Sequence, residues 1–298
     1  MPHPGEEELQ SRAGLSRQAW GSAGVGATIP PVAAEFLAEQ RFLVIAATDD
    51  AGAAWVSPLS GRPGFTHARD ERTVVVGRLP ATGDPLAGRF GAERDIGMIA
   101  IEPARRRRMR VNGRARRDGD HLVIHTEQVY SNCPKYIQTR TPSEGPPHQR
   151  GAVTVTRELT AAQQRWIVAA DTFFIGTYAA GLGIDASHRG GRPGFVTVTG
   201  DDRIVWPEYV GNSMFMTMGN LLLEPRCGLL FLDWTRGHTL HLTGRARLDE
   251  DPERVAAVPG AQRLVDFRVD RVVEVAGGLP DRWAFGEFFR HNPPVLSA

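Results

Sequence analysis

The segment SHRGGRPGF, at residues 187–195, repeats a segment much nearer the start of the chain, SPLSGRPGF at residues 57–65. The shared letters GRPGF are displaced by 130 residues (191 minus 61). A second pair of similar segments, DIGMIAIEPARRRRMRVNGRAR (95–116) and RCGLLFLDWTRGHTLHLTGRARLD (226–249), is displaced by 131 residues (247 minus 116). One inserted residue in the second half accounts for the difference between these two displacements. Because solenoid repeats have periods of about 20 to 50 residues, this spacing predicts a duplicated domain and not an array.

Both halves of the chain also begin in the same way. A segment of helical period runs into an apolar strand in PPVAAEFLAEQRFLVIAATDD (30–50) and again in TAAQQRWIVAADTFFIGTYA (160–179). Short alternating runs follow in each half, separated by Gly, Pro and Asp turns. The pattern predicts a mainly β protein with flanking helices: an N-terminal arm at 1–28, a small antiparallel barrel at 29–150 and a second barrel at 151–298.

The bulk composition narrows the class of protein. The chain has 298 residues, 35 basic and 34 acidic side chains, a net charge of +1 and 41% hydrophobic residues. This balance does not favour nucleic-acid binding. No apolar run of about 18 residues occurs, and the polar start MPHPGEEELQ is unlike a signal peptide. We therefore expect a cytoplasmic protein with neither a membrane nor a nucleic-acid partner.

Residues 192–247, RPGFVTVTGDDRIVWPEYVGNSMFMTMGNLLLEPRCGLLFLDWTRGHTLHLTGRAR, resemble the FMN-binding split-barrel superfamily, the pyridoxamine 5'-phosphate oxidase-like proteins. NCPKYIQ (132–138) and RRRMRVNGR (106–114) extend the resemblance. It implies that two barrels pair, with the flavin in the groove between them and its phosphate at a strand-to-helix turn. A tandem duplication would place both barrels in one chain, as an intramolecular pseudo-dimer with two grooves that need not be equal. Pro58 and His188, which differ between the repeats, would mark that divergence.

The turn PEYVGNSMFMTMGN (207–220) is the first predicted cofactor site. Gly211 allows close approach of the backbone, Asn212 and Ser213 supply short polar side chains, and the N–H groups of a following helix would favour a phosphate. In the alternative interpretation, Asn212 or Ser213 only caps that helix. Trp206 and Asn220, which flank the turn, complete this predicted set.

The turn also departs from the family pattern. The resemblance implies an arginine and a lysine at this turn, where Ser213 and Met214 stand, and GFVTVTG (194–200) contains neither of the family's substrate-binding basic residues. We therefore do not expect oxidation of pyridoxamine phosphate.

Basic residues from the first half could serve the cofactor instead. Strand alternation in RRRRMRVNGR (105–114) places Arg106, Arg108 and Arg110 on one face, where guanidinium groups could bind a phosphate. The alternative is a solvated face paired with carboxylates. Lys135, the only lysine, is a further cofactor candidate in YSNCPKYIQTR (130–140), interpreted as a helical turn. Cys133 is expected to pack as a small apolar residue, with a reactive thiol as the alternative.

His188 and Arg189 are the predicted catalytic residues. The glycines that follow them suggest an open loop beside the groove, although a loop histidine can equally be a surface hydrogen-bonding group. In a haem protein, His188 would be the first choice of axial ligand. The other histidines lack a third nearby ligand, so no zinc site is predicted.

These features predict an FMN-dependent oxidoreductase that acts on a small organic molecule. Two alternatives stay open: a haem-binding or haem-degrading split barrel, and a binding module that has lost its cofactor. The internal pairing of barrels leaves other faces on which a homodimer could form.

Overall fold

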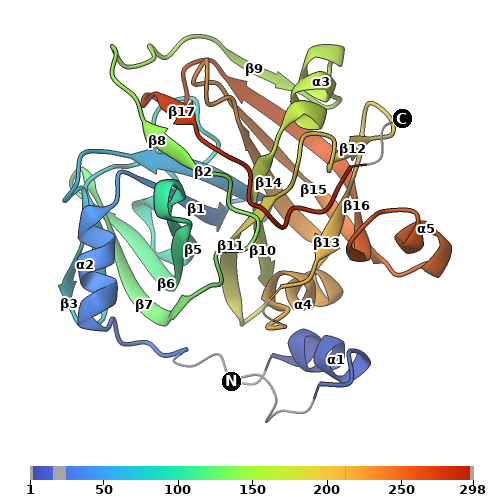
Figure 1. Cartoon of the computed structure of the whole chain (residues 1–298). Coiled ribbons are helices and arrows are strands. Elements are labelled where there is room, and N and C mark those ends of the chain that lie inside the picture. Colours follow the sequence, from blue (N-terminus) through green and yellow to red (C-terminus); the bar gives the residue numbers. More distant parts are fainter. Residues whose placement is uncertain (1–2, 16–24, 212, 296–298) are drawn as a thin grey trace.

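The computed structural model describes residues 3–15, 25–211 and 213–295 (Figure 1). The first half contains α1 (Pro4–Arg12), α2 (Pro31–Glu39), β1 (Phe42–Thr48), β2 (Ala54–Ser60), β3 (Thr66–Asp70), β4 (Thr73–Val76), η1 (Arg89–Gly91), β5 (Arg94–Glu102), η2 (Pro103–Arg105), β6 (Arg107–Asp118), β7 (His121–Ser131) and β8 (Arg140–Pro142).

The second half contains β9 (Val153–Thr156), α3 (Ala161–Ala169), β10 (Thr172–Ala179), β11 (Gly183–Gly190), β12 (Thr197–Val198), β13 (Arg203–Tyr209), α4 (Met216–Leu223), β14 (Arg226–Leu232), β15 (Thr239–Asp249), α5 (Pro252–Ala256), β16 (Ala261–Val275) and β17 (Trp283–Phe285). Within the described ranges, no helix is long and apolar enough to span a bilayer.

The two halves have the same sheet topology. The strand order is β2-β1-β5-β6-β7-β4-β3 in the first sheet and β11-β10-β14-β15-β16-β13-β12 in the second, which β9 extends by pairing with β16. Even the bulges correspond, because the register shifts at Asn112/Gly113 in β6 and at Thr243/Gly244 in β15. The fold is therefore two tandem split barrels, and the predicted fold class is confirmed.

The predicted helices precede the predicted strands in both halves. Helix α2 begins at Pro31, a residue whose fixed φ suits the first helical position, and it leads into β1. Helix α3 begins after Thr160, whose side chain accepts from the backbone of Gln163 in a complete capping box. Two residues separate each helix from the apolar strand that follows it.

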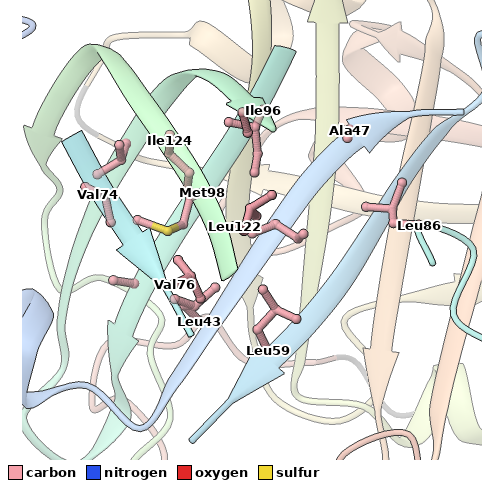
Figure 2. Close-up of a cluster of buried hydrophobic side chains, with 14 of the residues drawn as sticks. Leu43, Ala47, Leu59, Val74, Val76, Leu86, Ile96, Met98, Leu122 and Ile124 are labelled. Atoms are coloured by element: carbon pink, nitrogen blue, oxygen red, sulfur yellow. The ribbon is translucent and has the colours of Figure 1, made fainter. Parts of the chain in front are cut away.

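The central strands are buried on both faces. In β1, Leu43 points into the core of the first barrel (Figure 2), as does Ile45. Phe42 and Val44 belong to a separate cluster shared with the second barrel. This shared cluster includes Phe174 of β10. Because successive strand residues face opposite ways, one continuous apolar run supplies both a barrel core and the interface between barrels.

Glycines bring the barrels into backbone contact at two equivalent places. A Cβ on Gly97 of β5 would lie 2.6 Å from the backbone nitrogen of Ala186 in β11. A Cβ on Gly228 of β14 would lie 2.6 Å from the carbonyl oxygen of Ala54 in β2. The interface between barrels therefore has no room for a side chain at either position.

The two ends of the chain tie the halves together further. Strand β17 pairs with β8, so the C-terminal segment returns to the connection between the barrels. Helix α1 packs against α4, where a Cβ on Gly5 would lie 2.1 Å from the carbonyl oxygen of Gly219. The segment predicted as an arm is thus partly a helix docked on the second barrel (Figure 1).

Candidate functional site

A cavity of about 250 Å³ lies between the two barrels. Strand β6 and residues 132–136 form its wall on the first barrel, and β11, β13, β16 and the turn before α4 form its wall on the second. Ala13 and Leu15, which follow α1, close part of its rim. The cavity therefore occupies the groove in which the sequence predicts a cofactor.

Arg108 of β6 reaches across this groove to His188 of β11. Its Nη1 atom lies 3.1 Å from Nδ1 of His188, and its buried Nε atom has no hydrogen-bond partner. Burial, followed by repulsion from Arg110, lowers the pKa of Arg108 to about 10, so the guanidinium stays charged at neutral pH. Within the described residues, no carboxylate lies at ion-pair distance from Arg108.

His188 is uncharged near neutral pH. Burial, and then the charges of Arg108 and Arg189, hold its pKa well below the usual 6.5. Since a guanidinium can only donate, Nδ1 of His188 accepts from Arg108 and the ring proton lies on Nε2.

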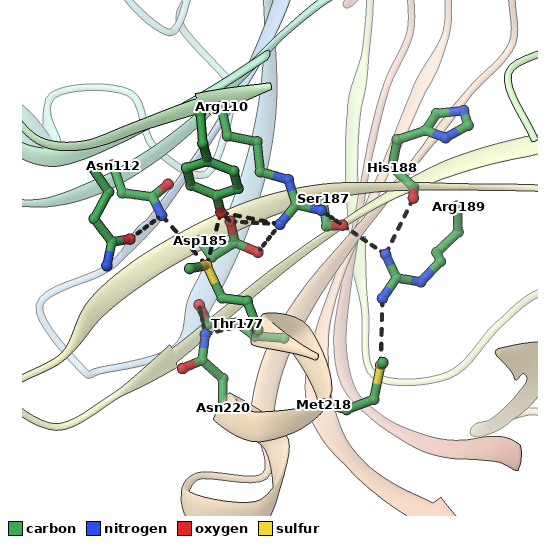
Figure 3. A network of polar contacts seen from close by, with 12 residues as sticks. Arg110, Asn112, Thr177, Asp185, Ser187, His188, Arg189, Met218 and Asn220 are labelled. Atoms are coloured by element: carbon green, nitrogen blue, oxygen red, sulfur yellow. Dashed lines mark hydrogen bonds and ion pairs between the residues drawn. The ribbon is translucent and has the colours of Figure 1, made fainter. Parts of the chain in front are cut away.

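Arg110, two residues along β6, is paired with a carboxylate through its terminal nitrogens, although its buried Nε atom has no hydrogen-bond partner (Figure 3). Its Nη1 atom lies 3.0 and 3.1 Å from the two carboxylate oxygens of Asp185, and its Nη2 atom donates to Ser187. Tyr130 also donates to Asp185, over 3.2 Å. Burial opposes the charge on Arg110, but the Asp185 carboxylate outweighs it and raises the pKa of Arg110.

Arg189 is neutralised in a similar way. Its Nε atom donates to Oε1 of Glu208 over 2.6 Å, and its Nη1 atom donates to Ser187 over 2.6 Å. The resulting network runs across the floor of the groove from β6 to β13, as Figure 3 shows for Arg110, Ser187 and Arg189. Of the arginines that line the cavity, Arg110, Arg189 and Arg263 each pair with a carboxylate, and Arg108 has no counterion among the described residues.

The turn before α4 presents a bare helix start to the cavity. Phe215 is the N-cap residue, in the left-handed conformation, and no side chain of the described residues caps the helix. Ser213 also has a positive φ of 59°, so the turn is sharply bent. Met216, Thr217 and Met218 line the cavity, which places the unbonded N–H groups of the first helical turn beside it. The alternative in which Ser213 caps α4 is therefore wrong.

The structure brings six of the predicted site residues together at this cavity. Arg108, Lys135, His188, Arg189, Gly211 and Ser213 all line it. Lys135 also donates to the carbonyl oxygen of Val210 over 3.4 Å. Asn212 lies outside the described residues.

Three other predicted cofactor residues lie elsewhere, and these predictions are corrected. Trp206 is fully buried in the core of the second barrel, because its position on β13 faces inward. Asn220 donates to Thr177 over 3.0 Å from within α4. Arg106 precedes β6 in a left-handed turn, so its guanidinium points to Ile137 and Glu287.

Two local predictions also need correction. The SHRGG segment is no open loop, because His188 and Arg189 belong to β11 and pair with Phe174 and Phe173 of β10. The segment around Lys135 is a turn without helix, which ends in Tyr136 at a positive φ of 66°. Cys227 is buried in the core of the second barrel, whereas Cys133 is half-buried at the cavity beside Arg108.

The equivalent groove on the opposite side of the pseudo-dimer is filled by the protein. In the second barrel, His241 of β15 stands where the first barrel has Arg110, and Thr239 stands where it has Arg108. Conversely, Ser57 of β2 stands where the second barrel has Ser187.

These equivalent residues are bonded to other parts of the protein. Asp84, from the connection between β4 and β5, accepts a hydrogen bond from Ser57 over 2.5 Å. Nδ1 of His241 lies 2.8 Å from the carbonyl oxygen of Val56, and both residues are buried. The two grooves are thus unequal, and the one containing His188 is the open one.

Haem does not fit His188. A ligating histidine offers an unprotonated nitrogen to iron and usually donates a hydrogen bond from its other nitrogen. His188 does the reverse, since Nδ1 accepts from Arg108 and Nε2 keeps the proton. Ligation through Nε2 would require that cationic hydrogen bond to break.

Sequence reasoning missed the residues that hold the site in place. Asp185 and Ser187 alternate along β11 with Arg189, which the sequence did single out, so a strand interpretation of GIDASHRG (183–190) would have placed both on the same face as Arg189. Glu208 carries no comparable local signal, because its partner lies 19 residues away.

The free energy of unfolding is expected to fall between about pH 4.5 and pH 7 because of Glu6 in α1. Burial, and then the Asp185 carboxylate, raise the pKa of Glu6 from 4.5 to about 7. In this range the folded protein keeps the proton and the unfolded chain loses it, so rising pH favours unfolding, by about 3 kcal/mol over the whole interval. Urea unfolding should show Glu6→Gln to be more stable than the parent protein at pH 8 and nearly equal to it at pH 5.

The matched control for that measurement is Glu8→Gln, on the exposed face of the same helix, where Glu8 pairs with Arg12. Its effect should be small at both pH values. A stability difference for Glu6→Gln that does not change with pH would contradict the prediction.

Solved structures similar to this chain match about two fifths of it, the length of one barrel. HupZ of Group A Streptococcus is 12% identical, with 38% of this chain and 92% of that protein covered and a TM-score of 0.32. A candidate pyridoxamine 5'-phosphate oxidase from Lactobacillus delbrueckii is 16% identical over 39% of this chain and 94% of that protein, with a TM-score of 0.33. An FAD-binding protein from Mesorhizobium loti is 13% identical over 42% of this chain and 98% of that protein, with a TM-score of 0.27.

The similar structures therefore include proteins of the pyridoxamine 5'-phosphate oxidase-like class that the sequence resembles. No family model and no curated protein sequence matches the chain.

Proposed function

We propose that the cavity between the barrels binds FMN by its phosphate, and that the protein is a flavin-dependent oxidoreductase with a small organic substrate. The observation that carries the proposal is the state of Arg108. It is a charged guanidinium at a cavity wall, it lacks a carboxylate partner among the described residues, and its Nε atom is buried without a hydrogen bond. A half-buried cation without a counterion is costly, so an anionic ligand would be bound favourably there.

The surrounding charges support an anion at this place. Asp185 and Glu208 are already paired with Arg110 and Arg189, so these two carboxylates do not compete with an anionic ligand for Arg108. Lys135 lines the same cavity and forms no ion pair within the described ranges. Two uncompensated cations therefore face one small space.

The start of α4 offers a second kind of phosphate contact. No side chain in the described part of the chain caps its first N–H groups, which adjoin the cavity, and a helix N-terminus favours negative charge. This arrangement is independent of the arginine and lysine side chains. It takes the place of the basic pair that the family resemblance implies at this turn.

Bound flavin would supply the hydride chemistry, and the residues of this chain would hold and orient it. Arg108, Lys135 and the first turn of α4 would bind the phosphate. His188 would present the proton on Nε2 as a hydrogen-bond donor, and its low pKa keeps the ring uncharged and Nδ1 as an acceptor for Arg108. Ala13 and Leu15 would help to exclude water from the rim.

A second candidate function is the binding of a smaller phosphate ester without a flavin. The volume of the cavity, about 250 Å³, favours it, because sites for drug-sized ligands usually have volumes of about 300–1,000 Å³. Met214 and Met216 separate this cavity from a larger one. Flexible methionine side chains can yield to a larger ligand, so FMN remains our first proposal.

The test is a titration of the purified protein with FMN, followed by flavin fluorescence. We expect FMN to bind at least 100-fold more tightly than riboflavin, and Arg108→Gln to remove most of this preference for the phosphate. The control is Arg107→Gln, since Arg107 lies on the opposite face of β6 against the ring of Phe36.

The outcomes separate the two candidates. Equal affinity for FMN and riboflavin, or unchanged FMN binding by Arg108→Gln, would refute the assignment of the phosphate site. Binding of glycerol phosphate that depends on Arg108, in a protein that takes up no FMN, would support the second candidate.

A further inference from the structure

A second cavity, of about 620 Å³, lies beneath α1. Glu6 and Gln10 of α1 line one side of it, Asn112 of β6 and Gln128 of β7 line another, and the turn at residues 181–183 lines a third. It is a separate space from the groove that contains Arg108, although Met214 and Met216 border both. Neither Arg108 nor Lys135, the two cations proposed to bind the phosphate, lines it.

Two buried oxygen atoms at this cavity have no hydrogen-bond partner. Oε1 of Glu6 and Oδ1 of Asn112 are both without one, although the residues are only 8% and 6% exposed. Asn112 is held in place by its amide nitrogen, which donates to Oε1 of Gln128 over 2.9 Å. Because buried polar atoms are nearly always paired, two unpaired acceptors on facing walls indicate a ligand that donates hydrogen bonds.

The charge around the cavity favours a cationic donor. Glu6 and Glu127 contribute carboxylates to the lining. Arg114, on the same wall, is already bound to Asp95 over 2.7 Å, and Arg110 below the floor is bound to Asp185. The positive groups nearby are therefore compensated.

We propose that this cavity is a binding site for a small organic ammonium ion. An ammonium group has three N–H donors, which can satisfy the Glu6 and Asn112 oxygens together while its charge meets the Glu6 carboxylate. A metal ion fits less well, because no group of three His, Cys, Asp or Glu residues within the described ranges could hold one.

The position of α1 makes this site specific to the folded full chain. Helix α1 is seated on α4 by the close approach of Gly5 to Gly219, and Nε2 of His3 lies 2.8 Å from Oδ1 of Asn220. These contacts hold Glu6 opposite β6. The site therefore combines one wall from the N-terminal segment with others from both barrels.

The experiment uses benzylamine as the probe and benzyl alcohol as its neutral counterpart, followed by isothermal titration calorimetry of the full chain without added flavin. It is done at pH 8, where Glu6, which faces Asp185, Arg110 and Glu7, is largely ionised. We expect one equivalent of benzylamine to bind, and benzyl alcohol to bind at least tenfold more weakly. Glu6→Gln and Asn112→Ala should each weaken benzylamine binding at least tenfold.

Two controls place the probe. Glu8→Gln, on the outer face of α1, and Arg108→Gln, in the other cavity, should leave benzylamine binding unchanged, and circular dichroism should show every variant to be folded. No stoichiometric binding by the parent protein, or equal binding by Glu6→Gln, would overturn the proposal. Failure of FMN to bind would leave this result unaffected, because the probe is tested without flavin.

Discussion

Replacement of Asp185 by asparagine should lower the free energy of unfolding by about 3–5 kcal/mol, the usual cost of leaving one member of a buried ion pair unpaired. The side chains of Arg110 and Asp185 are only 9% and 2% exposed. Asparagine preserves the shape of Asp185 but removes the charge, so the guanidinium of Arg110 would be buried without a counterion. Tyr130 would lose a charged acceptor at the same time.

Urea unfolding measures this effect, and Asp95→Asn is the matched control. Asp95 pairs with Arg114 over 2.7 Å, but these side chains are 46% and 38% exposed. Water and salt screen such a pair, so its loss should cost no more than about 1 kcal/mol. Similar costs for the two variants would show that Arg110 and Asp185 are far better solvated than the structure indicates.

Substitution of alanine for Gly228 should cost about 3 kcal/mol, because the added methyl group would meet backbone atoms that cannot move independently. The nearest is the carbonyl oxygen of Ala54, 2.6 Å from the new Cβ, and the Cα atom of Trp55 is at 2.9 Å. Relief requires β14 to separate from β2, which would open the interface between the barrels. Gly97→Ala should behave in the same way at the equivalent contact with Ala186.

Gly91→Ala is the control, since a Cβ there would meet nothing within 4 Å. Thermal and urea unfolding should both detect the difference between the variants. If Gly228→Ala unfolded at the same denaturant concentration as Gly91→Ala, the two barrels would not be packed as closely as the structure shows.

The inequality of the two grooves could not be derived from the repeats. The sequence shows Pro58 in one copy and His188 in the other, which predicts divergence but not its form. The deciding contact is made by Asp84, which lies in a connection outside the repeated motifs and fills one groove by bonding to Ser57. Such a contact depends on how a loop folds back over a sheet.

The arginine row illustrates the same limit. Alternation along β6 correctly predicted that Arg108 and Arg110 share a face. Their chemistry nevertheless differs, because Asp185 of β11 lies opposite Arg110, whereas His188 lies opposite Arg108. One arginine is therefore a structural ion-pair member and the other is available to a ligand.

The sequence alone determined the duplication, the mainly β class, the helix before each first strand and six of the residues that line the open groove. These features are local, since they follow from repeated motifs and from the periods of helices and strands. The tertiary structure decided which groove is open, which arginine lacks a counterion, and that α1 covers a second cavity. Those properties depend on side chains that meet across the barrels, such as Arg108 and His188, 80 residues apart. Burial and charge pairing at such contacts are set only when the chain has folded.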